Sequence, residues 1–83
     1  GGTAPAVLNA ANEVAVAAFL DGKIPYRALV RVVEKVLEGH RVSPAATLEA
    51  VLAADREARR LASELLASGA TLASPGTVAP RPA

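Results

Sequence analysis

Apolar residues recur with helical spacing in three segments of the chain, and glycine and proline separate these segments. The first predicted helix runs from about Ala4 to Leu20, with Thr3 as a candidate N-cap and Pro5 in its first turn. Gly22 suits the left-handed position that ends a helix. This segment is apolar nearly all round its helical wheel, which is typical of a central, mostly buried helix.

The second predicted helix runs from about Pro25 to Glu38 and ends at Gly39. Its apolar stripe consists of Tyr26, Leu29, Val30, Val33, Val36 and Leu37. Its polar stripe consists of Arg27, Arg31, Glu34, Lys35 and Glu38. Spacing of this kind predicts an amphipathic helix, and we interpret the charged stripe as a solvated face rather than an interaction surface.

The third predicted helix runs from about Thr47 to Ser68, with Thr47 as its N-cap and Gly69 just past its end. Its apolar residues cover about half of the helical wheel and are Leu48, Val51, Leu52, Ala58, Leu61, Ala62, Leu65 and Leu66. Asp55 and Arg59 project into this apolar half. They lie four residues apart, so they can reach one another along the helix.

Residues 70–83 read ATLASPGTVAPRPA and show no periodicity. Three prolines and a single charged residue predict a disordered tail. The sequence therefore predicts one all-α domain over residues 1–69, a three-helix fragment of a small helical bundle, followed by this tail.

Composition narrows the class of protein further. The chain has 83 residues, no cysteine, one Phe and one Tyr, so its core is small, rich in alanine, valine and leucine, and without disulfides or thiolate zinc sites. A net charge of +1 without a basic face argues against nucleic acid as a partner. The longest apolar run, Val14 to Leu20, is too short to span a membrane, so we expect a cytoplasmic protein. Because the chain begins at Gly1 without methionine, we expect it to be a piece of a longer protein.

Asn9, Asn12 and Glu13 fall within one arc about 100° wide on the first predicted helix. The favoured interpretation is a structural network that bonds to loop backbone or to a basic side chain. A second helix start capped by Asn9 comes next. Direct catalysis comes last, because the sequence offers no nucleophile, metal-ligand cluster or phosphate-binding glycine loop.

Asp55 and Arg59 are interpreted in the same way. Arg59 could anchor an anion, but an ion pair that fixes how its helix packs is the favoured hypothesis. Glu13 is a candidate further partner for Arg59. The predicted polar network thus comprises Asn9, Asn12, Glu13, Asp55 and Arg59, with no catalytic, cofactor-binding or metal-binding residue. His40 follows Gly39 in a connection and is predicted to be a surface histidine.

The run GGTAPAVLNAANEVAVAAFL, the helix start KIPY and the later segment LEAVLAADREAR occur in this order. Together they resemble the C-terminal helical domain of 1-deoxy-D-xylulose 5-phosphate reductoisomerase, over residues 1 to about 68. The resemblance implies a four-helix-like domain whose first helix precedes Gly1, so apolar surface should be uncovered in this chain.

The resemblance also implies the function of the parent protein. Members of this family are homodimers of the methylerythritol phosphate route to isoprenoids, and they use NADPH with Mg²⁺ or Mn²⁺ to make 2-C-methyl-D-erythritol 4-phosphate. Their metal, phosphate and cofactor motifs have no counterpart here, so the fragment itself should be inactive. We expect it to brace the catalytic domain, with the remaining domains of the parent as its partners. The alternative is an independent helical module that binds other proteins.

Overall fold

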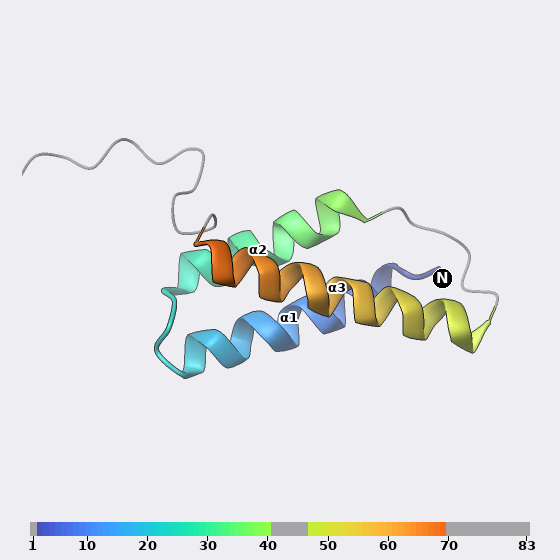
Figure 1. Ribbon diagram of the computed structural model, residues 1–83, viewed down its shortest axis with the longest axis horizontal. Helices are drawn as coiled ribbons and strands as arrows, with labels where there is room; N and C mark the ends of the chain where they lie inside the picture. Colours follow the sequence, from blue (N-terminus) through green and yellow to red (C-terminus); the bar gives the residue numbers. More distant parts are fainter. Residues whose placement is uncertain (1, 41–46, 70–83) are drawn as a thin grey trace, which may run out of the picture.

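The chain folds into three helices, α1 (Ala4–Leu20), α2 (Tyr26–Gly39) and α3 (Leu48–Ser68), as the computed structural model shows (Figure 1). The structure describes residues 2–40 and 47–69, and these residues contain no strand. Helices α1 and α3 run in the same direction, and α2 runs opposite to both (Figure 1). The predicted all-α fold is confirmed. The predicted tail, residues 70–83, lies outside the described residues.

The ends of the helices follow the sequence closely at four of the five predicted positions, and Gly39 is the last residue of α2 as predicted. Gly22 and Gly69 adopt φ values of 74° and 72°, the left-handed conformation in which glycine carries no Cβ penalty. The Thr47 hydroxyl accepts a hydrogen bond of 3.0 Å from the backbone N–H of Ala50, so Thr47 caps α3 as predicted. Thr3 differs, because it precedes α1 but its side chain makes no capping hydrogen bond.

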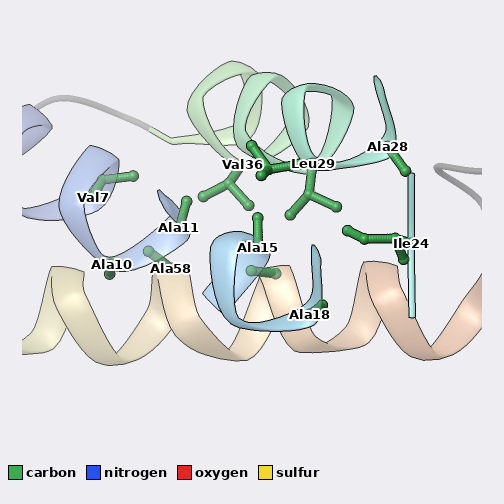
Figure 2. Packing of buried hydrophobic residues seen from close by; sticks show 12 residues of the cluster. Val7, Ala10, Ala11, Ala15, Ala18, Ile24, Ala28, Leu29, Val36 and Ala58 are labelled. Carbon is green, nitrogen blue, oxygen red and sulfur yellow. The ribbon is translucent and has the colours of Figure 1, made fainter. Parts of the chain in front are cut away.

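The core lies where α1 packs against both other helices (Figure 2). Its buried members are Val7, Ala10, Ala11, Ala15, Ala18, Ile24, Ala28, Leu29, Val32, Val36, Ala58 and Ala62. Most of them are alanines, which let helix backbones approach closely because the side chain is a single methyl group. Shape matching at these small residues therefore decides how the three helices pack.

Helix α1 is central but not mostly buried, so that prediction is wrong. Only five of its 17 residues are buried, and all five belong to the core cluster that α1 forms with α2 and α3. Leu8 and Leu20 on its other sides are 47% and 75% exposed. A helix that is apolar all round becomes buried only if enough partners surround it, and two neighbouring helices leave one side open.

None of the helices within the described ranges is long and apolar enough to cross a membrane.

Candidate functional site

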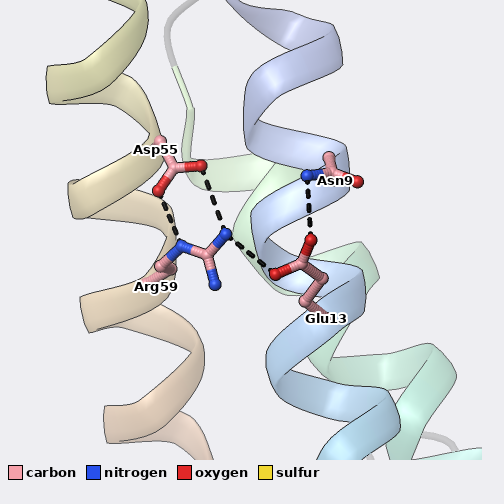
Figure 3. A network of polar contacts seen from close by, with 4 residues as sticks. All are labelled: Asn9, Glu13, Asp55 and Arg59. Atoms are coloured by element: carbon pink, nitrogen blue, oxygen red, sulfur yellow. Dashed lines mark hydrogen bonds and ion pairs between the residues drawn. The ribbon is translucent and has the colours of Figure 1, made fainter.

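Four of the five residues of the predicted polar network come together between α1 and α3 (Figure 3). The Arg59 Nη2 donates to Glu13 Oε1 at 3.0 Å, and this contact joins residues 46 positions apart. Arg59 also donates from Nε to Asp55 Oδ1 at 2.6 Å. On α1, Asn9 Nδ2 donates to Glu13 Oε2 at 3.3 Å. Since α1 and α3 run side by side in the same direction, one guanidinium can bridge them.

The electrostatics of this network follow from the shape of the guanidinium. Arg59 presents its fork of donors to two carboxylates, and the hydrogen bond to Asp55, followed by the one to Glu13, raises the pKa of Arg59 above its ordinary range. The side chains of Arg59 and Glu13 are 40% and 57% exposed, so water and salt screen the attraction. The network therefore adds little to stability, although its hydrogen bonds link one position of α1 to one turn of α3.

Asn12 stands apart from this network. It is exposed on α1, and it makes no hydrogen bond with another described residue. All three polar residues of the α1 cluster are exposed, so they lie at the surface rather than in a packed core. The alternative of a second helix start at Asn9 is wrong, because α1 begins at Ala4 and continues through that position.

A second polar contact joins the beginning of α1 to the end of α2. The Thr3 hydroxyl and His40 Nε2 share a hydrogen bond of 2.7 Å across 37 positions of sequence. Thr3 is 2% exposed and His40 is partly buried, so the prediction of a surface histidine is wrong. The pair could not be predicted from the sequence, because Thr3 suited a local cap and no local spacing pointed to a distant histidine.

A third group of charges lies on α3 beside its groove with α2. Arg60 donates hydrogen bonds to both Glu57 and Glu64. The hydrogen bond from Arg60, helped by its charge, outweighs desolvation and lowers the pKa of Glu57 below the ordinary 4.5. The same two carboxylates raise the pKa of Arg60. Both acids border an open groove between α2 and α3 of ≈ 720 Å³, whose apolar floor is Val36, Leu61 and Leu65.

Two of these arrangements connect different parts of the bundle, namely Arg59 with Glu13 and Thr3 with His40, whereas the Arg60 group lies within α3. Across residues 2–40 and 47–69, no three histidine, cysteine, aspartate or glutamate side chains gather as a metal site would require. Glu13, Asp55, Glu57 and Glu64 each bond to an arginine. Carboxylates paired in this way hold their arginines in place.

Comparison with known proteins supplies the family. Residues 1–61 match the family described as DXP reductoisomerase C-terminal domain. A 1-deoxy-D-xylulose 5-phosphate reductoisomerase of Cupriavidus metallidurans is 62% identical over 68 residues, which are 82% of this chain and 17% of that protein. The enzyme of the same name from Dechloromonas aromatica is 58% identical over 66 residues, 80% of this chain and 17% of the relative. This chain therefore spans less than a fifth of the curated relatives that it matches.

A solved structure supports the same conclusion at the level of the fold. The 1-deoxy-D-xylulose 5-phosphate reductoisomerase from Zymomonas mobilis, in complex with NADPH, superposes with a TM-score of 0.72 and 50% sequence identity. The match covers 80% of this chain and 18% of that one. The resemblance noted from the sequence is thus confirmed, and the chain belongs to the family of DXP reductoisomerase C-terminal domains.

Proposed function

We propose that this chain is the C-terminal part of a longer reductoisomerase that converts 1-deoxy-D-xylulose 5-phosphate to 2-C-methyl-D-erythritol 4-phosphate with NADPH, in isoprenoid biosynthesis. The observation that carries the proposal is the match to the C-terminal domain family over residues 1–61, together with relatives of this activity whose length extends far beyond it. We propose the parent to be a homodimer, as the family resemblance implies, and to be cytoplasmic, as the absence of a long apolar run in this sequence suggested.

Within this parent, the role proposed for the chain is to brace the catalytic domain. The support is an alanine-rich core that packs three helices closely, and an ion network that ties α1 to α3. The described residues do not suit a divalent metal, because they bring no three suitable ligands together. We assign the Mg²⁺ or Mn²⁺ and the NADPH of the parent to residues outside this chain.

The test is substrate-dependent oxidation of NADPH, measured for the full-length protein and for the 83-residue chain. We expect turnover by the full-length protein and none by the chain, with far-UV circular dichroism showing that the chain sample is helical. Turnover by the chain alone would contradict the bracing role. A full-length protein that oxidises no NADPH with this substrate would contradict the assigned reaction.

An independent interaction module is the second candidate, and the exposure of Tyr26 and Leu37 on α2 favours it. The coding sequence upstream of Gly1 separates the two. A long reading frame with a glycine-rich nucleotide-binding turn after a strand supports the enzyme, whereas a nearby start codon supports the module.

A further inference from the structure

We draw no further inference here: the strongest candidate, the open groove between α2 and α3 with its apolar floor of Val36, Leu61 and Leu65, carries none because nothing in the structure shows what covers it.

Discussion

The Thr3 hydroxyl lies 2.7 Å from His40 Nε2, so the residue before α1 is tied to the residue after α2. Thr3 is almost completely buried, and a hydroxyl can donate to or accept from an imidazole nitrogen. This contact closes the end of the bundle at which the chain enters α1.

Removing this hydrogen bond should lower the stability of the bundle. Thr3→Val keeps the shape of the side chain and loses the hydroxyl, so we expect the free energy of unfolding to fall by about 1 kcal/mol. Urea unfolding of Thr3→Val, His40→Phe and the double variant gives the coupling energy of the pair. If Thr3→Val lowers the free energy of unfolding equally in the presence of His40 and of His40→Phe, the two side chains do not interact.

The ion pair between Arg59 and Glu13 should make the stability of the chain depend on the salt concentration. Arg59→Gln removes a contact between helices, so we expect a lower urea midpoint than for the unsubstituted chain. Because the network is partly exposed, this difference in midpoint should shrink as the salt concentration rises. Asn9→Ala should act in the same direction, since Asn9 bonds to Glu13. Asn12→Ala is the matched control and should change the stability by less than about 0.5 kcal/mol. An effect of Arg59→Gln that is independent of salt would point to packing instead.

The alanines of α1 should tolerate no enlargement on the core side. Ala15 is completely buried where α1 meets its neighbours, so Ala15→Leu should destabilise the fold by about 1–3 kcal/mol through overpacking. Ala17→Leu places the same side chain on the exposed side of the same helix and should be nearly neutral. Chemical denaturation of the two variants makes the comparison. Similar losses at both positions would mean that helix propensity, rather than close packing, sets the effect.

The hydrogen bond from Arg60 should keep the Glu57 carboxylate ionised to a lower pH than an ordinary glutamate. Its pKa in the folded chain lies below the ordinary 4.5, so its contribution to stability is complete above that value and is lost as the pH falls through the folded pKa. NMR titration of the Glu57 carboxyl carbon should give a midpoint below 4.5. Arg60→Gln should move the midpoint back toward the ordinary value, and Arg56→Gln should not. A midpoint that does not respond to Arg60→Gln would exclude the hydrogen bond as the cause.

Features that depend on a few adjacent residues could be predicted from the sequence. Gly22 and Gly69 end their helices because only glycine enters the left-handed region at no cost, and Thr47 caps α3 because its hydroxyl reaches an N–H three residues on. The contact between Asp55 and Arg59 follows from a spacing of four on one helix. The pairing of Arg59 with Glu13 required a hypothesis about how two helices pack, and the structure shows that contact.

The sequence by itself determined the three helices, their ends and the small apolar residues available to a core, because these depend on local backbone preferences and helical periodicity. Only the tertiary structure decided which apolar face is covered. Leu8 and Ala11 lie on the same helix and are both apolar, yet one is 47% exposed and the other fully buried, since burial depends on which neighbours pack against each side. For the same reason Thr3 bonds to His40 instead of capping its own helix: a distant partner, brought close by packing, replaces the local one.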